Sequence, residues 1–260
     1  MLKLPRSWSD ITINQFIEID KISKSTPKSE DEFYFNIVSL LADLPIEELE
    51  SMDYEDFHPL IKDLKYLTEI PPPFKPKEKI ETSLGTMYLK NNFNRDLLNG
   101  EFIDLEYLMQ SENYIENIKM IMAIFYRIKI SDNDGLHNEK FEPYGNWVQL
   151  RAELFGEQKV GDVFGVIPQF LEFRENFFKK YEGLFDSTEP EEFESIAGES
   201  ISDRKNREEA SKKTSLIKKW GWNVLMYQLA NNDALKVDEA YGLPFIFSMN
   251  LMSMKKELSI

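Results

Sequence analysis

Cysteine is absent from this 260-residue chain, and histidine occurs only twice, as His58 and His137. The absence of cysteine excludes disulfides, thiolate nucleophiles and zinc sites built on thiolates. The two histidines lie in unrelated polar surroundings, one beside Pro59 and the other in the segment SDNDGLHNEK. A Ser-His-Asp triad or a histidine metal site therefore has little support. We expect no catalytic residues, no metal ligands and no cofactor-binding residues.

The chain also lacks the patterns of phosphate, hydrolase and calcium sites. It has neither a glycine-rich phosphate loop nor a G-x-S-x-G elbow. Asp132, Asp134 and Gly135 resemble part of a calcium loop, but Ile130 stands where the first ligand is needed. A surface turn is the better interpretation of this segment.

Long hydrophobic runs are missing too. The N-terminus, MLKLPRSWSD, has no apolar signal-peptide region, and no run approaches the roughly twenty apolar residues of a membrane span. These patterns predict a soluble protein made in a cytoplasm. The net charge is −15, from 31 Lys and Arg against 46 Asp and Glu. Nucleic acid is therefore not expected as the main partner, because phosphate binding needs a surplus of Lys and Arg.

What the chain does contain is enough apolar residues for a core, at 42% hydrophobic and 13% aromatic. We expect the rest of the chain to pack around residues 100–151. The centre of this stretch is the apolar run IKMIMAIFYR at 118–127. The spacing of Ile118, Met122 and Phe125 places these side chains on one face of a helix. Most of the remaining positions are apolar as well, which is typical of a helix buried on several sides.

Periodicity, caps and breakers predict helices over most of the chain. Thr12 caps the first helix, Pro59 limits the start of the fourth, and Pro168 implies a kink or a late start in the helix that contains it. Gly85 divides ETSLGTMYLK into a small β-hairpin. The predicted helices cover residues 8–22, 31–44, 45–52, 53–67, 91–109, 118–128, 162–181, 215–230 and 237–258.

We predict a mainly α fold of several helical lobes, with the hairpin between the first two. The charged segment 186–213 is either a disordered linker or an arm that orders on a partner. The predicted parts are an N-terminal helical lobe at 1–70, a Pro-rich linker and hairpin at 71–90, a central helical lobe at 91–185, the charged linker at 186–213, and a C-terminal helical block at 214–260.

Two helical units resemble each other. Residues 14–20 read NQFIEID and residues 100–106 read GEFIDLE, and each stretch is followed by a polar bridge and a strongly apolar helix. Duplication would stack the apolar faces of such units on one another. Duplicated units and chance similarity within an all-α chain both account for the match.

Four residues around the end of the central helix form a candidate structural lock. Arg127 ends the apolar run, Glu142 and Tyr144 follow it, and Arg151 comes next. A buried Arg–Glu pair or an Arg–Tyr stack would tie the loop to the helix end.

Aromatic and methionine side chains are the candidates for partner contacts. Side chains at i and i+2 of a helix diverge, so one tryptophan of the Trp220-Gly221-Trp222 motif should meet a neighbouring lobe or another protein, and the glycine permits close approach of another backbone. The late methionines fit either core packing or a partner groove. The candidate partner-binding residues are Trp8, Trp147, Trp220, Trp222, Met249 and Met252.

Short motifs in a shared order resemble a known group of phage proteins. They are SWSDITINQFIEI, EFIDLEYL, the run ending in FYR, EPY at 142–144, and WGWNVLMYQLANNDALKVDEAYGLPF. Together they resemble the tail assembly chaperone-like proteins of tailed-bacteriophage morphogenesis modules, in the style of phages of Bacteroidetes hosts that include the crAss-like group. The resemblance covers most of the chain outside the charged segment.

The resemblance implies a helical, non-enzymatic protein without cofactors that holds the tape-measure protein while the tail is built. The implied partners are tape-measure, portal or tail proteins, with a homo-oligomer as a further option. The implied location is the host cytoplasm during assembly or the virion. The chain is longer than typical members, which leaves a second role open, as a structural protein retained at the head–tail junction or as packaged cargo. An enzyme with clustered carboxylates is the third hypothesis.

Overall fold

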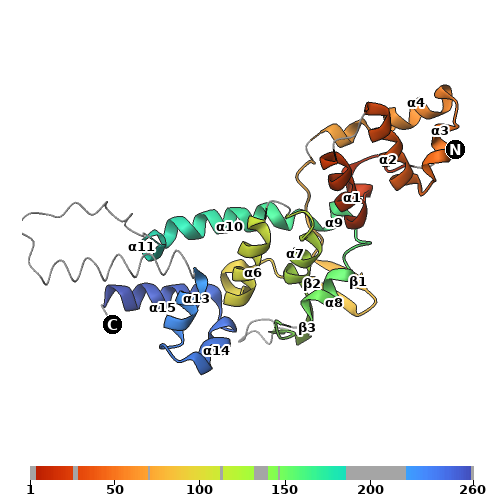
Figure 1. Ribbon diagram of the computed structural model, residues 1–260. Helices are drawn as coiled ribbons and strands as arrows, with labels where there is room; N and C mark the ends of the chain where they lie inside the picture. Colours follow the sequence, from red (N-terminus) through yellow and green to blue (C-terminus); the bar gives the residue numbers. More distant parts are fainter. Residues whose placement is uncertain are drawn as a thin grey trace, which may run out of the picture. The chain divides into compact units, whose positions relative to one another are not determined.

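The computed structural model confirms that the chain is mainly helical, with one small sheet. It forms two compact units (Figure 1). Unit 1 comprises Met1–Asn91 and Leu105–Leu171, and unit 2 comprises Asn92–Asp104 and Glu172–Ile260. The structure describes residues 4–25, 29–69, 71–111, 114–131, 140–145, 147–185 and 221–258.

This division differs from the predicted lobes. The predicted central lobe at 91–185 contributes to both units, and helices α6 (Asn99–Gln110) and α10 (Val166–Lys180) each carry residues of both. The predicted linker at 186–213 lies outside the described residues.

Unit 1 contains most of the short helices and the whole sheet. Its helices, with 3-10 turns written η, are η1 (Trp8–Asp10), α1 (Ile13–Lys24), α2 (Glu30–Ala42), α3 (Ile46–Glu50), α4 (Tyr54–Asp63), η2 (Lys65–Thr68), α7 (Ile118–Phe125), α8 (Val148–Glu153) and α9 (Val160–Val163). Its strands are β1 (Lys79–Thr82), β2 (Gly85–Leu89), β3 (Tyr126–Ser131) and β4 (Lys140–Phe141).

A capping box fixes the start of α1. The Thr12 hydroxyl accepts a hydrogen bond from the Gln15 backbone N–H at 3.2 Å, and the Gln15 side chain accepts one from the Thr12 backbone N–H at 3.0 Å. Two donors that an α-helix leaves open at its start are thereby satisfied. Ile11 and Ile13 on either side are fully buried, so the cap also directs two apolar side chains into the core.

Trp8 belongs to the same core. Its ring packs edge-on against Phe16 and Tyr66, with centroids 5.7 and 5.9 Å away, and its Nε1–H donates to the Glu69 carbonyl at 3.1 Å. The apolar side chains of the N-terminal motif SWSDITINQFIEI therefore pack inside unit 1.

Glycines let a distant segment dock on this N-terminal region. Val160 N–H donates to the Ile11 carbonyl at 2.8 Å, and Ile13 N–H donates to the Gln158 carbonyl at 2.9 Å. A Cβ on Gly161 would lie 2.5 Å from the Ser9 Cβ and 2.8 Å from its Cα, closer than non-bonded atoms can come. Only glycine allows the two backbones to approach this far.

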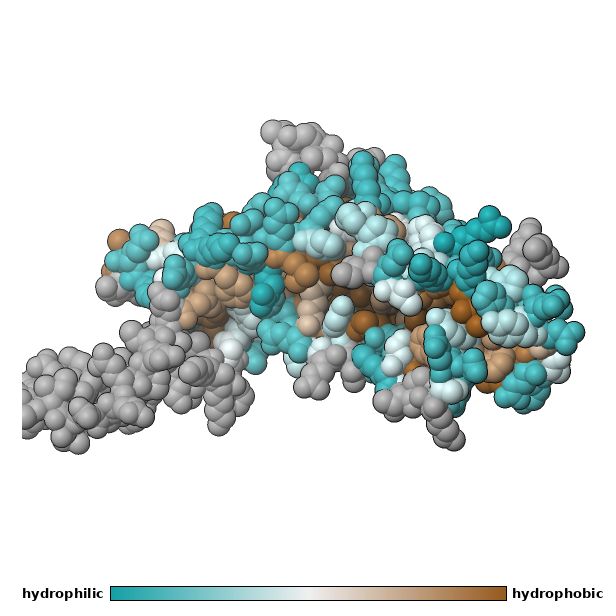
Figure 2. Space-filling model, turned by 90° about the horizontal axis from the view of Figure 1, so that it is seen from above, coloured by the Kyte–Doolittle hydropathy of each residue, from teal (hydrophilic) through white to brown (hydrophobic). Residues whose placement is uncertain are grey.

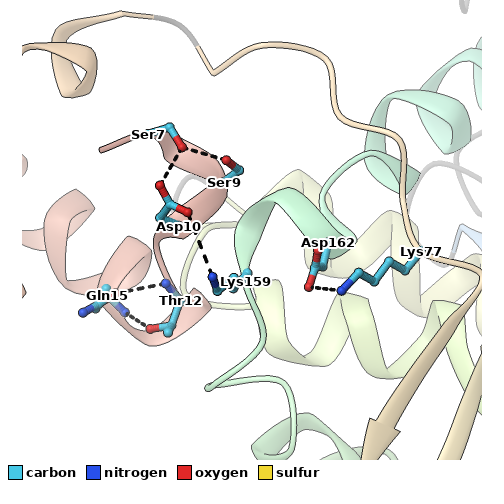
Figure 3. A network of polar contacts seen from close by, with 8 residues as sticks. All are labelled: Ser7, Ser9, Asp10, Thr12, Gln15, Lys77, Lys159 and Asp162. Carbon is cyan, nitrogen blue, oxygen red and sulfur yellow. Dashed lines mark hydrogen bonds and ion pairs between the residues drawn. The ribbon is translucent and has the colours of Figure 1, made fainter. Parts of the chain in front are cut away.

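Polar contacts surround the docked segment (Figure 3). Lys159 lies 4.0 Å from the Asp10 carboxylate on one side, and the Asp162 carboxylate pairs with Lys77 at 2.8 Å on the other. Ser7 donates to Asp10 at 2.9 Å. These ion pairs are largely exposed, so they orient the segment more than they stabilise it.

The central helix is shorter than predicted. All residues of α7 except Lys119 and Met120 are buried, as the apolar run indicated, but the helix ends at Phe125 and the chain continues directly into β3. The prediction of helix up to residue 128 was wrong because β3 pairs with β2, Leu89 opposite Tyr126. This long-range pairing overrides the helical period.

The sheet is antiparallel, in the order β1-β2-β3-β4. The predicted hairpin is present as β1 and β2, with Gly85 at φ +110° in its turn. It does not stand between two lobes, however, because β3 adds to β2 and incorporates the hairpin into unit 1. Tyr126 on β3 is fully buried, and its hydroxyl donates to the Lys77 carbonyl at 2.8 Å.

Prolines divide or shift several predicted helices. Pro59 lies inside α4 and not at its start, so that prediction was wrong. Pro168 is the third residue of α10, which therefore starts late, one of the two predicted alternatives. The predicted helix at 237–258 is interrupted before Phe245, because Pro244 is the N-cap of the second part. The predicted helix at 91–109 is also divided, at Leu97, where the chain is extended.

Unit 2 is built around an aromatic cluster. Its remaining helices are α5 (Phe93–Asp96), α11 (Glu182–Phe185), α13 (Trp222–Leu229), η3 (Ala234–Lys236), α14 (Val237–Tyr241) and α15 (Phe245–Glu257). Phe102 stacks on Phe245, with ring centroids 3.8 Å apart and planes 13° apart. The cluster consists of Phe102, Phe173, Phe177, Phe178, Phe185, Trp222 and Phe245.

A buried amide connects three helices of unit 2 beside the cluster. The Asn99 side chain on α6 donates to the Ala240 carbonyl on α14 at 2.7 Å and to the Ser248 hydroxyl on α15 at 2.8 Å. Both Asn99 and Ser248 are fully buried. Such directional bonds fix the register of the packed helices, which apolar contacts alone do not.

Hydrophilic residues predominate on the face seen in Figure 2, with hydrophobic areas between them. Among the described residues, no helix is both long enough and apolar enough to cross a membrane.

Two glycines provide a matched test of the docking. We expect Gly161→Ala to lower the free energy of unfolding by about 2 kcal/mol or more, because the new methyl group would meet the Ser9 backbone. Gly183→Ala on α11 should leave stability unchanged or raise it by up to about 1 kcal/mol, since no described residue lies within 4 Å of its Cβ position. Urea denaturation of both variants measures the difference, and equal losses would contradict the docking.

Tyr126 and the partly buried Tyr66 provide a second matched pair. Tyr126→Phe should lose about 1 kcal/mol of stability, because the bond to Lys77 is lost. Tyr66→Phe should be neutral or stabilising, because within the described residues the buried Tyr66 hydroxyl has no hydrogen-bond partner.

The same tyrosines should give a dependence on pH. Burial raises the pKa of both phenols above the ordinary tyrosine range. The unfolded chain therefore loses these protons first, so the free energy of unfolding should fall as the pH rises above about 10. The fall should be smaller in Tyr126→Phe, and an unchanged pH profile would contradict the burial effect.

Candidate protein interfaces

The four residues of the predicted lock lie together in unit 1. Arg151 on α8 donates from Nη1 to the Glu142 carboxylate at 2.7 Å, and the Arg127 guanidinium on β3 lies over the Tyr144 ring, 5.6 Å from its centroid. Both arginines are 1% exposed. The backbone N–H of Glu142 also donates to the Ile128 carbonyl at 3.0 Å. The Arg–Glu pair and the Arg–Tyr stack are thus both present.

An exposed apolar pair lies at the start of α8, between Tyr144 and Arg151 of the lock. Trp147, the N-cap of α8, is 60% exposed, and Leu150 is 49% exposed. Positions three apart lie on the same side of a helix, and Val148 and Ala152 bury the other side. We call Trp147 and Leu150 the α8 apolar pair. Tryptophan is enriched among the residues that contribute most of the binding free energy of protein interfaces. A side chain on a segment that is already held in place loses less conformational entropy when a partner binds.

Helix α15 in unit 2 has apolar residues on two opposite sides. Its inner side buries Phe245, Met249 and Met252. Its other side carries Phe247 at 57%, Met254 at 47% and Leu258 at 60% exposure, with Leu251 partly buried among them. We call the set Phe247, Leu251, Met254 and Leu258 the outer stripe.

Of the outer stripe, the sequence analysis included only Met254, as one of the late methionines, and it missed Phe247, Leu251 and Leu258. The signal of the outer stripe was the spacing of four, three and four residues, which places all four side chains on one side of a helix. Methionines of the inner side and of the outer stripe lie close together in the sequence. Composition alone therefore could not tell which of them are buried and which are exposed.

The predicted partner contacts fall into different places. Trp147 is exposed, as a contact residue must be. Trp8, Met249 and Met252 are at most 8% exposed and pack in the cores of their units, so the expectation that they face a partner is corrected. Their neighbours within the chain already cover their apolar surface.

The tryptophan-glycine-tryptophan motif is described only in part. Trp222 is partly buried in the aromatic cluster, 5.4 Å from the ring of Phe185. Trp220 lies outside the described residues. Gly221 has φ +50°, and among the described residues nothing lies within 4 Å of its Cβ position. Glycine adopts this positive φ readily at the start of α13, and the described part of the chain contains no close backbone approach there.

Candidate chemistry is sparse in the described part of the chain. There, no group of three or more His, Cys, Asp or Glu side chains could hold a metal ion. His58 lies on α4 beside the Tyr54 ring, with centroids 5.3 Å apart. His137 and the segment with Asp132, Asp134 and Gly135 lie outside the described residues.

Comparison of the chain with family models, with curated proteins and with solved structures found no match. The geometry of these surfaces and the motifs in the sequence are therefore the features that bear on function.

The lock predicts a specific loss of stability. Glu142→Ala should lower the free energy of unfolding by about 2–3 kcal/mol, because it removes a carboxylate from a guanidinium that is 1% exposed. Glu142→Gln should lose less, since its amide oxygen can still accept the bond. Thermal or urea unfolding measures both.

The control for the lock is Glu175→Ala. Glu175 pairs with Lys179 at 2.7 Å, but both side chains are about 70% exposed, so little change in stability is expected. An effect as large as that of Glu142→Ala would show that burial of the pair does not matter.

Proposed function

We propose that this chain is a non-enzymatic assembly protein of a tailed bacteriophage that binds other virion proteins. In this proposal it acts like a tail assembly chaperone and holds the tape-measure protein or other tail components until assembly buries their apolar segments. The shared order of the motifs in its sequence supports the phage assignment.

The observation that carries the binding role is the α8 apolar pair. Trp147 and Leu150 expose apolar surface at the start of a helix whose other side is buried. The Arg151–Glu142 pair, at 2.7 Å, holds this segment. A large aromatic anchor on a preorganised segment is the kind of group that dominates protein interfaces.

The mechanism would be masking. An apolar segment of a partner, exposed before the tail is complete, covers the α8 apolar pair and is itself kept from aggregating. Because the chain carries a net charge of −15, a complex of this kind would also gain solubility.

A structural protein retained in the virion is the second candidate role. The length of the chain and its additional C-terminal block, beyond what is usual for the chaperone type, favour it. In that role the portal or another protein of the head–tail junction would be the partner, and the same apolar pair would stay covered in the particle.

Co-expression with tape-measure and portal proteins from a phage genome that encodes this chain tests the binding role. The tagged chain should capture one of them, and Trp147→Ala with Leu150→Ala should weaken capture at least about tenfold. Leu235→Ala is the matched control, since Leu235 is 92% exposed but lies on η3 in unit 2. A monomer that binds neither protein would contradict the proposal, as would capture that the double variant leaves unchanged.

Mass spectrometry of purified particles distinguishes the two roles. A chaperone should be absent from mature virions, whereas a structural component should be present in a fixed ratio to the portal protein.

A further inference from the structure

The segment 156–165 of unit 1 is bound on two sides by parts of the chain that are distant in the sequence. On the N-terminal side, the backbone N–H of Ile13 donates to the Gln158 carbonyl at 2.9 Å. On the side of the Pro-rich segment, the backbone N–H of Lys77 donates to the Asp162 carbonyl at 2.7 Å. We call residues 156–165 the strap. Figure 3 shows part of the strap between the N-terminal segment and the segment that carries Lys77.

Glycines bring both sides into close contact with the strap. A Cβ on Gly161 would lie 2.5 Å from the Ser9 Cβ on the N-terminal side. A Cβ on Gly165 would overlap the Phe74 carbonyl and would lie 2.6 Å from the Pro76 Cδ on the other side. A side chain at either position would therefore push the strap away from the side that it faces.

Both sides also share one hydrophobic cluster. Val160 of the strap is fully buried in the core formed by the helices of residues 4–69. Phe164 packs edge-on against Phe16, with ring centroids 4.9 Å apart, and Phe74 of the Pro-rich segment packs against the same core. Within the described residues, this cluster includes none from α7 or the sheet. The cluster can therefore open while the core around α7 stays packed.

The strap has little regular structure of its own. Its helix, α9, has four residues, and a single turn is not stable alone, because starting a helix costs more than its first hydrogen bond returns. Three of the ten residues of the strap are glycine, which raises the conformational entropy of the detached strap. Once one side lets go, nothing within the strap keeps it in place for the other side. Both contacts should therefore be lost together.

We propose that the strap is a conformational device that opens in one step. When it opens, it releases the N-terminal helices and the Pro-rich segment together, while α7 and the sheet stay folded. The open form would uncover the rings of Trp8 and Phe16, which pack together in the closed form. The proposal does not depend on the binding of virion proteins through the α8 apolar pair, so either can fail without the other.

Hydrogen exchange of the full chain, followed at single backbone amides by NMR, tests the proposal through crossed effects. Gly165→Ala changes the Pro-rich side, yet the Ile13 amide on the N-terminal side should exchange at least about tenfold faster. Gly161→Ala changes the N-terminal side, yet the Lys77 amide on the Pro-rich side should also exchange at least about tenfold faster. Two independent contacts would not give this crossed pattern.

Reference amides show whether the opening is local. The Ile121 amide of α7 donates to the Asn117 carbonyl at 3.0 Å, and the Phe245 amide of unit 2 donates to the Leu97 carbonyl at 2.8 Å. Both should exchange at the wild-type rate in each variant. Gly183→Ala in unit 2 is the matched control, and it should leave the exchange of the Ile13 amide unchanged.

Val160→Ala is a second variant that introduces no clash. It removes buried methyl groups from the strap and keeps its backbone, so it serves if either glycine variant fails to fold. Because the Ile13 and Lys77 amides share one opening, Val160→Ala should speed their exchange by the same factor.

Three results would overturn the proposal. Each glycine variant could speed exchange only on its own side, which would mean that the two contacts open separately. Val160→Ala could speed the exchange of Ile13 and leave Lys77 unchanged, with the same meaning. Finally, Ile121 could become faster by the same factor as Ile13 and Lys77, which would mean that the strap opens only when the whole of unit 1 unfolds.

Discussion

The close approach of two backbones that are far apart in the sequence holds unit 1 together. Val160 bonds to Ile11 and Gln158 bonds to Ile13, while Gly161 leaves no side chain between the segments. Both isoleucines and Val160 are fully buried. The contact therefore combines paired backbone groups with apolar burial, and neither could form if the glycine carried a side chain.

This contact also explains the first motif of the sequence. Trp8 was expected to contact a partner, yet it packs in the core, whereas Thr12, predicted as a cap, does cap α1 together with Gln15. A well-defined sequence motif can therefore reflect packing inside the fold, without any contact with a partner.

The local features of the fold could be predicted from the sequence, and the long-range ones could not. Thr12 as a cap, the buried run around Met122 and the turn at Gly85 each depend on a few neighbouring residues. The strand that begins at Tyr126 depends on pairing with Leu89, and no local pattern records such a partner. The division of the predicted central lobe between two units has the same origin, because Leu97 accepts a backbone hydrogen bond from Phe245.

The candidate interface residues likewise include some that could be predicted from the sequence and some that could not. The lock was visible because two arginines and a glutamate stood close together along the chain, and burial of both guanidiniums makes their pairing necessary. The exposure of Trp147 and the burial of Trp8 could not be told apart beforehand, since a tryptophan suits a core and an interface equally. The solvent exposure of each side chain depends on how the unit that contains it packs, and the sequence does not give that packing.

The contact between Phe185 and Trp222 has a consequence for how this chain can vary. Their ring centroids are 5.4 Å apart, so the end of α11 and the start of α13 lie side by side in unit 2 although they are distant in the sequence. A smaller side chain at either position would leave a cavity against the other helix. The two positions should therefore vary together.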